Sequence, residues 1–141
     1  MTIKYDSATI GLMNIFENIS KAKVKDCFVD QNQQLVFIVE ENELPKAIGK
    51  AGQNVKRFES ISNKKIKLIE YNANIEKFIK NVFYPIRFES IIQEEGKEGI
   101  ITIIPTDTRS RGLLIGRSAQ SLRYTESIVK RYFPIKELKV Q

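Results

Sequence analysis

The sequence contains no histidine, and it has a single cysteine among its 141 residues. Without histidine the chain cannot form Ser-His or Cys-His nucleophilic pairs, histidine general bases or histidine-ligated metal sites. Cys27 alone cannot form an internal disulfide or a thiolate cluster, and its apolar neighbours Phe28 and Val29 predict a buried strand position. We therefore expect neither a metal nor another cofactor.

Long hydrophobic runs are also missing. The first six residues, Met1 to Asp6, lack the apolar core of a signal peptide, and no apolar stretch approaches the length needed to span a membrane. The expectation is a cytoplasmic protein with no membrane partner.

Acidic residues are fewer than basic ones, 17 against 23, which gives a formal net charge of +6. A basic surface attracts polyanions such as nucleic acid, but many basic proteins simply carry a solvated positive face. Charge alone favours neither interpretation.

Glycine is scarce, with seven residues, yet it recurs in one pattern. An isoleucine, a glycine and a basic residue precede a polar helix at Ile48–Gln53 and again at Ile115–Gln120. Chance alone gives roughly 0.3 matches to Gly-x-x-Gly in such a chain, so one occurrence is weak evidence. Glycine lets the backbone approach a bulky ligand, and the amides at the start of a helix attract phosphate.

The two turns belong to a longer repeat with a separation of 67 residues. At this shift apolar residues coincide, and so do glutamate, serine and isoleucine. The coinciding pairs are Ala8 and Ile75, Leu12 and Ile79, Ile15 and Val82, Phe16 and Phe83, Val55 and Leu122, Glu59 and Glu126, Ser60 and Ser127, and Ile61 and Ile128. The repeat predicts a tandem duplication, with a first domain at residues 1–72 and a second at residues 73–141.

Each module has the predicted order helix, strand, strand, short helix, glycine turn, helix, strand. In the first module the apolar run Leu35–Val39 predicts a central strand covered on both faces. Asn42 is a candidate cap for the short helix, and Pro45 suits its first turn. We expect an α+β fold in which each module has a three-stranded sheet with its helices packed on one face.

This order, with Gly-x-x-Gly between two helices, resembles the type II KH domain of bacteria and archaea. Residues 42–57 carry the signature: an apolar residue, the glycine turn and an amphipathic helix in sequence. Tandem modules filling a chain of this size resemble the archaeal NusA-like transcription factors. In KH domains the turn clamps the backbone of about four single-stranded nucleotides while an apolar groove receives the bases.

The resemblance implies binding of single-stranded RNA and a part in transcription elongation, termination or antitermination. Because a short linker holds two modules that take about four nucleotides each, we expect a run of about six to ten nucleotides to be bound. We also expect a monomer. It leaves RNA polymerase or a transcription complex open as a partner. A ribosome- or rRNA-associated KH protein, and a protein-interaction scaffold that keeps only the fold, remain alternatives. Enzyme activity is not expected, because Gly-Lys-Ala-Gly lacks the spacing and hydroxyl of a P-loop and no acid and base pair up.

The residues expected to bind RNA cluster at the two turns. They are Ile48, Gly49, Lys50, Ala51, Gly52, Lys56, Arg57, Ile115, Gly116, Arg117, Ser118, Ala119 and Arg123. Lys50 and Arg117 are the expected phosphate contacts. Ile48 and Ile115 face either the base groove or the core, and we expect the core.

Ala119 departs from the pattern because it replaces the last glycine of the second turn. If this position needs a positive φ, alanine costs roughly 1 kcal/mol or more and its methyl hinders a close phosphate. If the position is already helical, alanine is favourable there.

Overall fold

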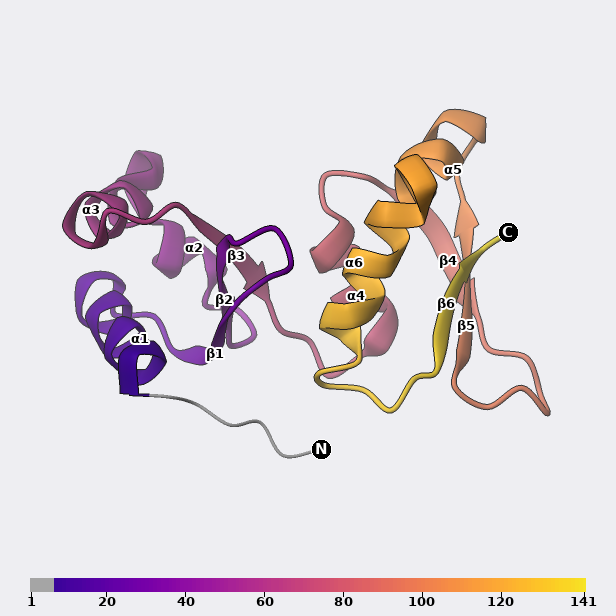
Figure 1. Ribbon diagram of the computed structural model, residues 1–141, viewed down its shortest axis with the longest axis horizontal. Coiled ribbons are helices and arrows are strands. Elements are labelled where there is room, and N and C mark those ends of the chain that lie inside the picture. Colours follow the sequence, from indigo (N-terminus) through magenta and orange to yellow (C-terminus); the bar gives the residue numbers. More distant parts are fainter. Residues whose placement is uncertain (1–6) are drawn as a thin grey trace. The chain divides into compact units, whose positions relative to one another are not determined.

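The computed structural model describes residues 7–141, so residues 1–6 of the expected first domain lie outside the described part. The chain divides into two compact units after Asn72 (Figure 1). Each unit contains one three-stranded sheet, and each is described by itself.

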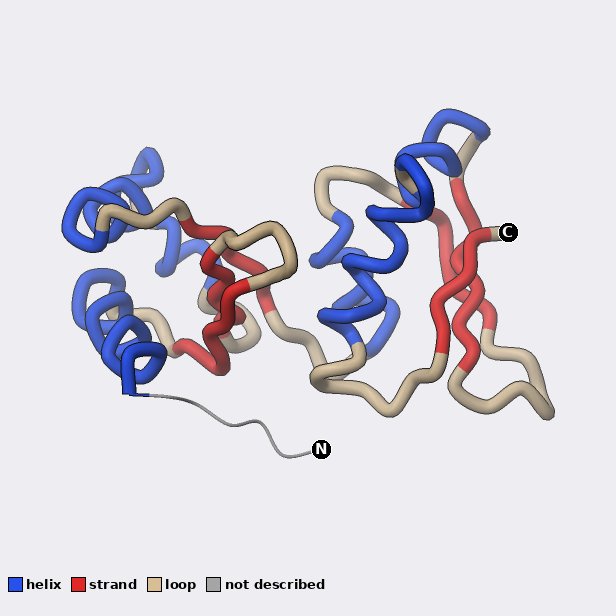
Figure 2. Tube along the Cα trace, in the orientation of Figure 1, coloured by secondary structure: helices blue, strands red, loops and turns tan. Residues whose placement is uncertain are grey.

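The first unit consists of α1 (Ser7–Ser20), β1 (Val24–Val29), β2 (Leu35–Val39), α2 (Leu44–Ile48), the 3₁₀ turn η1 (Lys50–Gly52), α3 (Gln53–Ser62) and β3 (Ile66–Glu70). Its sheet has the order β1-β2-β3, in which β2 pairs antiparallel with β1 and parallel with β3. The helices lie on one face of this sheet (Figure 2).

The second unit consists of α4 (Ile75–Phe83), β4 (Phe88–Ile92), β5 (Ile100–Pro105), α5 (Thr108–Ile115), η2 (Arg117–Ala119), α6 (Gln120–Val129) and β6 (Glu137–Val140). Its sheet repeats the topology of the first, with β5 antiparallel to β4 and parallel to β6. Both antiparallel pairs also carry a register irregularity near their start, between Val24 and Asp26 and between Phe88 and Ser90.

Three phenylalanines join the layers of the first unit. Phe16 of α1 stacks on Phe37 of β2 at 4.7 Å between ring centroids, and Phe58 of α3 meets both rings edge-on at 5.3 and 5.4 Å. All three side chains are fully buried, so each contributes on the order of 2–3 kcal/mol of hydrophobic stabilisation. Because Phe58 lies on α3, this cluster also fixes the helix that follows the glycine turn.

The second unit uses different aromatic contacts. Phe78 of α4 meets Phe133 at 5.6 Å, and Phe83 meets Phe88 at 6.2 Å. Thr125, which occupies the repeat position of Phe58, is buried. The repeated backbone therefore encloses two differently packed cores.

The predicted α+β fold and the KH element order are confirmed. β2 is buried along its whole length, and Cys27 lies in the core as expected. Two details were wrong. Asn42 does not cap α2, since the N-cap is Glu43 and its side chain makes no capping hydrogen bond. The helical spacing of Val55, Phe58 and Ile61 predicts that all three face inward, but Ile61 is 59 % exposed.

Among residues 7–141, no helix has both the length and the apolar character needed to cross a membrane.

Candidate nucleic-acid interface

The first turn reverses the chain between α2 and α3 by means of three residues with positive φ. Gly49 adopts φ 77° and ψ 174°, a region that is essentially restricted to glycine. Ala51 (φ 54°, ψ 29°) and Gly52 (φ 74°, ψ 16°) follow in left-handed conformations, which together have the geometry of a type I′ turn. α3 then begins at Gln53.

The backbone hydrogen bonds within the turn are donated by its last amides. Gly52 N–H donates to the Gly49 carbonyl at 3.2 Å, and Gln53 N–H donates to the Lys50 carbonyl. The amides of Lys50 and Ala51 come before these bonds, at the start of a 3₁₀ turn, where no preceding helical carbonyl is in line to accept. Such amides suit an anionic oxygen.

The second turn has the same backbone. Gly116 (φ 74°, ψ 176°), Ser118 (φ 52°, ψ 34°) and Ala119 (φ 61°, ψ 21°) reproduce the first turn to within about 15° at each angle. Position 119 therefore needs a positive φ, which decides between the two alternatives left open by the sequence. Alanine is strained there, at a cost of roughly 1 kcal/mol or more.

The first glycine of both motifs and the second glycine of the first motif are required for different reasons. A Cβ added at Gly49 would lie 2.7 Å from Asn54 Nδ2, and one at Gly116 would lie 2.8 Å from the Ser121 backbone nitrogen. A Cβ added at Gly52 would meet nothing within 4 Å. The first glycine is thus fixed by crowding as well as by its dihedral angles, whereas the second is fixed by its dihedral angles alone.

Exposed cations surround the first turn. Lys50, Lys56 and Arg57 are exposed, and among the described residues none of them forms an ion pair. Arg117 has the same status on the second turn. Four of the cations expected to bind RNA, three in the first unit and one in the second, are therefore exposed and form no ion pair among the described residues.

Arg123 was also expected to bind RNA, but its charge is paired with carboxylates. Its guanidinium contacts the Glu126 carboxylate at 2.5 Å and lies 3.8 Å from Glu137. Lys130 also approaches Glu126, at 3.6 Å. The charges of Arg123 and Lys130 in the second unit are therefore largely balanced by carboxylates.

The isoleucines before the turns are not core residues of the expected kind. Ile48 is 37 % exposed, which makes the core prediction wrong for this residue, and Ile115 is half-buried. Leu113, two residues before Ile115 on α5, is 50 % exposed, and the sequence analysis did not name it as a candidate. The residue at the same repeat position in the first unit is Lys46. This change from a charged to an apolar residue was the signal that could have identified Leu113 as a candidate.

Asn54 is a second residue that sequence reasoning missed. Its side-chain amide donates to the Lys46 carbonyl at 2.9 Å and so satisfies an acceptor at the end of α2. Because Asn54 lies in the first turn of α3, this bond ties the two helices together across the turn. The polar character of the first residues of α3 was the available signal.

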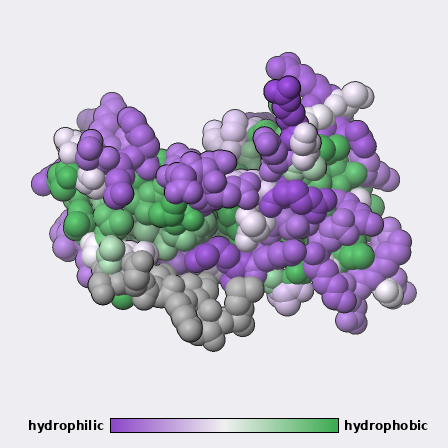
Figure 3. Space-filling view, in the orientation of Figure 1, coloured by the Kyte–Doolittle hydropathy of each residue, from purple (hydrophilic) through white to green (hydrophobic). Residues whose placement is uncertain are grey.

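Hydrophilic residues dominate the surface drawn over the α2–α3 end of the first unit (Figure 3). This agrees with the exposure of Lys50, Lys56 and Arg57, and it gives the turn a polar and positively charged surrounding.

Comparison with known proteins identifies the family. The chain is 33 % identical over 140 residues to a protein of Methanococcus vannielii named probable transcription termination protein NusA, covering 99 % of this chain and 80 % of that one. The chain belongs to the NusA family. A NusA protein of Methanocaldococcus jannaschii with the same printed name is 31 % identical, over 98 % of this chain and 75 % of its own length.

Within the NusA family, the model of the NusA-like second KH domain matches residues 13–74, which lie mainly in the first unit. A solved structure described as the crystal structure of APE1850 has a TM-score of 0.80 and 24 % identity, covering 97 % of this chain and all of that one. This likeness concerns the fold. The chain therefore shares its fold with a solved structure, and its sequence with curated relatives, along nearly its whole length.

Proposed function

We propose that the chain binds single-stranded RNA through its two glycine turns and takes part in transcription termination or antitermination. The observation that carries this proposal is the first turn, where the amides that start a 3₁₀ turn, a glycine with open space at its Cβ position and an exposed lysine lie on one bend. The printed names of the relatives, which are probable transcription termination proteins, support the transcriptional role.

The chemistry of the turn fits a sugar-phosphate backbone. Amide N–H groups and a lysine ammonium can both bind a phosphate oxygen, and the missing Cβ at Gly52 leaves room for the backbone of the ligand. Ile48, at the end of α2, offers exposed apolar surface next to the turn for a base. The thirteen residues named from the sequence stay a proposal, with Arg123 the weakest member because its charge is already paired.

The decisive experiment replaces Gly52 by aspartate. The position tolerates a side chain sterically, and aspartate adopts left-handed conformations more readily than most residues, so the unit should stay folded. The added carboxylate would repel phosphate. In fluorescence anisotropy titrations with ten-nucleotide single-stranded RNA, we expect Gly52→Asp to raise the Kd at least tenfold.

Gly52→Asn is the matched control, because it has nearly the same shape and backbone preference without the charge. It should weaken binding less than Gly52→Asp does. Equal affinity of the wild type and Gly52→Asp would refute RNA binding at this turn. Binding should also weaken with salt, since phosphate contacts release counterions.

Cross-linking and sequencing of bound RNA in the native cell would separate the transcriptional role from the ribosomal alternative. Recovery of nascent transcripts supports the proposal, whereas recovery of ribosomal RNA alone favours a ribosome-associated role. A chain that binds no RNA at moderate salt but copurifies with a stable protein complex would favour the scaffold. A cytoplasmic location, a monomeric state and contact with RNA polymerase are further parts of the proposal.

A further inference from the structure

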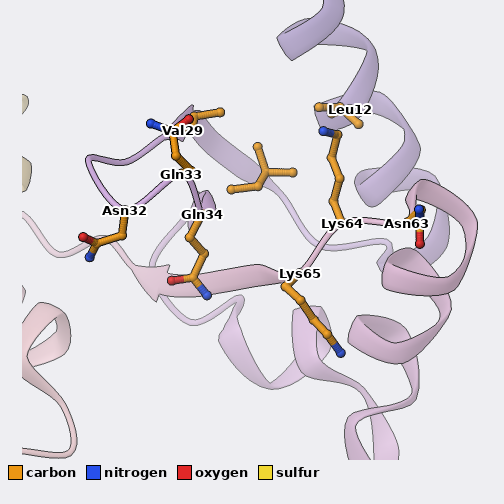
Figure 4. A pocket seen from close by; sticks show the side chains of 9 residues that line it. Leu12, Val29, Asn32, Gln33, Gln34, Asn63, Lys64 and Lys65 are labelled. Atoms are coloured by element: carbon orange, nitrogen blue, oxygen red, sulfur yellow. The ribbon is translucent and has the colours of Figure 1, made fainter.

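The first unit contains a hollow of about 540 Å³ at the end of α3 away from the glycine turn. It lies between α1, the turn joining β1 to β2, and the link from α3 to β3 (Figure 4). Its lining residues are Leu12, Val29, Asn32, Gln33, Gln34, Leu35, Asn63, Lys64 and Lys65. The hollow has six polar or basic side chains and no carboxylate in its lining.

These side chains suit a nucleotide. Amide groups of asparagine and glutamine both donate and accept, so they can pair with base edges, and lysine ammonium groups bind phosphate. Val29 is 60 % exposed and provides apolar surface against which a base can lie. In Figure 4 the Lys64 side chain extends toward Leu12 of α1, whereas Lys65 extends away from it.

The β1–β2 turn, which carries the side-chain amides of residues 32–34, is held by one carboxylate. Asp30 Oδ1 accepts hydrogen bonds from the backbone N–H groups of Asn32 and Gln34, both at 2.9 Å. The backbone is thus satisfied within the turn, and this leaves the side-chain amides of residues 32–34 free to line the hollow. A preformed turn binds a ligand at a lower cost in ordering.

A second hollow, of about 350 Å³, extends from this region along α3 in the direction of the glycine turn. It shares Asn63, Lys64 and Lys65 with the first hollow and continues along α3 to Ser60 and Lys56. Lys56, Ser60 and Lys64 recur at a spacing of four residues. The first two therefore lie on one face of α3, and Lys64 follows just beyond the end of the helix. α3 is about 15 Å long at 1.5 Å per residue, so a strand held at the turn must extend beyond it to reach the hollow.

Glu59 makes two contacts in the second hollow, and neither prevents RNA from binding along α3. Glu59 Oε2 accepts a hydrogen bond from Ile66 N–H at 3.0 Å, which anchors the start of β3. Its other oxygen lies 3.7 Å from Lys65 Nζ, but the Lys65 side chain is 88 % exposed. Ion pairs of this exposure are weak, so Lys65 can exchange Glu59 for a phosphate.

The second unit has a hollow at the equivalent place, with the opposite chemistry. Its volume is about 360 Å³, and its lining is mainly apolar: Ala73, Ile75, Gln93, Gly99, Ile101, Phe133, Pro134 and Ile135. The neighbouring β4–β5 connection carries Glu94, Glu95 and Glu98, and β6 begins with Glu137. The basic and amide-rich lining is thus specific to the first unit rather than a property of the fold.

We propose that the hollow at Lys64 and Lys65 is an additional RNA subsite of the first unit, which binds nucleotides beyond those held at the Gly49–Gly52 turn. The strand follows α3 past Lys56 and Ser60, Lys64 and Lys65 hold its phosphates, and the amides of residues 32–34 read a base. This inference rests on the proposed RNA-binding function, and it extends that function from a four-nucleotide clamp to a longer track with its own base preference.

The test compares short and long RNA on the full chain. Fluorescein-labelled oligo(U) and oligo(A) of four and ten nucleotides are titrated by anisotropy, in an Ala119→Asp background that makes the second turn repulsive. We expect Lys64→Gln/Lys65→Gln to raise the Kd for the ten-nucleotide RNAs about tenfold, and to leave the four-nucleotide Kd within about twofold. Asn32→Ala/Gln34→Ala should reduce the difference between oligo(A) and oligo(U) at ten nucleotides.

The control is Lys136→Gln/Lys139→Gln, which removes the same charge from the second unit and should change the ten-nucleotide Kd by no more than about twofold. An equal loss for both RNA lengths, or no loss with either, would overturn the subsite while leaving the glycine-turn function standing. If the unmodified chain binds neither length, the proposed function itself fails, and the subsite fails with it.

Discussion

The two glycine turns follow one backbone path but differ at the second glycine. Gly49 and Gly116 combine glycine-only dihedral angles with crowding, so neither position accepts a side chain. Gly52 and Ala119 both have left-handed dihedral angles, and a Cβ added at Gly52 meets no neighbouring atom. An alanine at this position of the turn therefore costs backbone strain but does not displace neighbouring atoms. The comparison teaches that losing the second glycine of such a motif weakens the turn but does not abolish the fold.

The surroundings of the two turns differ in charge as well. In the first unit Lys50, Lys56 and Arg57 are free of ion pairs among the described residues, whereas Arg123 of the second unit is engaged by Glu126 and Glu137. Both the backbone and the electrostatics therefore make the first unit the stronger candidate for phosphate binding. Each prediction below compares matched positions of the two units.

The largest effect should come from the first glycines. Gly116→Ala places a Cβ 2.8 Å from the Ser121 backbone nitrogen, whereas the nearest atoms to the Cβ of Gly49→Ala belong to the Asn54 side chain. We expect Gly116→Ala to destabilise its unit by about 3 kcal/mol and Gly49→Ala by somewhat less, since a side-chain neighbour can shift. Urea unfolding with amide hydrogen exchange in each unit measures both. A cost for Gly116→Ala no larger than that for Gly52→Ala would contradict this assignment.

The next largest effect concerns a glutamate that both units use to hold the last strand. Glu126 is buried and accepts from Leu138 N–H at 2.8 Å, whereas Glu59 is half-buried and accepts from Ile66 N–H at 3.0 Å. Glu126→Ala leaves a buried donor unsatisfied and should cost about 2 kcal/mol, against about 1 kcal/mol for Glu59→Ala. Glutamine variants, which keep the acceptor, are the controls in the same unfolding assay. Equal losses in the two units would show that burial of the donor is not the deciding factor.

A third prediction compares the cations at the tips of the turns. Lys50→Ala should raise the Kd for ten-nucleotide RNA about tenfold, which corresponds to about 1.4 kcal/mol, and Arg117→Ala should raise it less. The reason is that Ala119 hinders close approach of the ligand backbone at the second turn. Each variant should also lower the salt dependence by about one counterion. A larger loss for Arg117→Ala would reverse the ranking of the two units.

The sequence predicted the element order and the duplication because both depend on local patterns. The apolar run at 35–39, the proline of α2 and the paired glycines each act within a few residues. Details that depend on tertiary contacts could not be predicted. Ile61 fits the apolar face of a helix by its spacing, yet it is 59 % exposed because Phe58 alone on that part of α3 reaches the core cluster.

The candidate site shows the same division. The exposed cations at the turns followed from their place in the repeat. Arg123 also followed the repeat. Its i,i+3 spacing from Glu126 on α6 is a local pattern that could have indicated their ion pair, whereas its contact with Glu137 of β6 depends on the packed structure. The hollow at Lys64 and Lys65 combines α1, a strand turn and the end of α3, so it required the packed structure.

The fourth prediction restores the second glycine. Ala119→Gly removes the strain of a left-handed alanine and should stabilise the second unit by about 1 kcal/mol, despite the greater flexibility of glycine in the unfolded chain. Thermal or urea unfolding of the full chain measures this change. The variant should also narrow the difference between the Arg117 and Lys50 effects on RNA affinity. A destabilised Ala119→Gly chain would mean that position 119 is not left-handed.

The smallest effect concerns acid sensitivity, because the helices before the turns begin differently. Asp107 caps α5, and the hydrogen bond that its carboxylate accepts from Ser110 N–H at 2.7 Å lowers the pKa of Asp107. In α2 the corresponding carboxylate, Glu43, makes no cap, and its pKa is lowered chiefly by the hydrogen bond from Lys23 N–H at 2.8 Å. Because a lowered pKa means that the ionised form is favoured by folding, the stability from Asp107 is complete above the unfolded pKa of about 3.9.

As the pH falls through the lower folded pKa of Asp107, this contribution should be lost and the start of α5 should open first. The Ser110 amide, followed by NMR or hydrogen exchange, reports the change, and Asp107→Asn keeps a cap that does not titrate. In the first unit, acid should instead release the Lys23 amide and leave the start of α2 unchanged. An Asp107→Asn chain in which the Ser110 amide shows the wild-type acid response would exclude Asp107 as the titrating group.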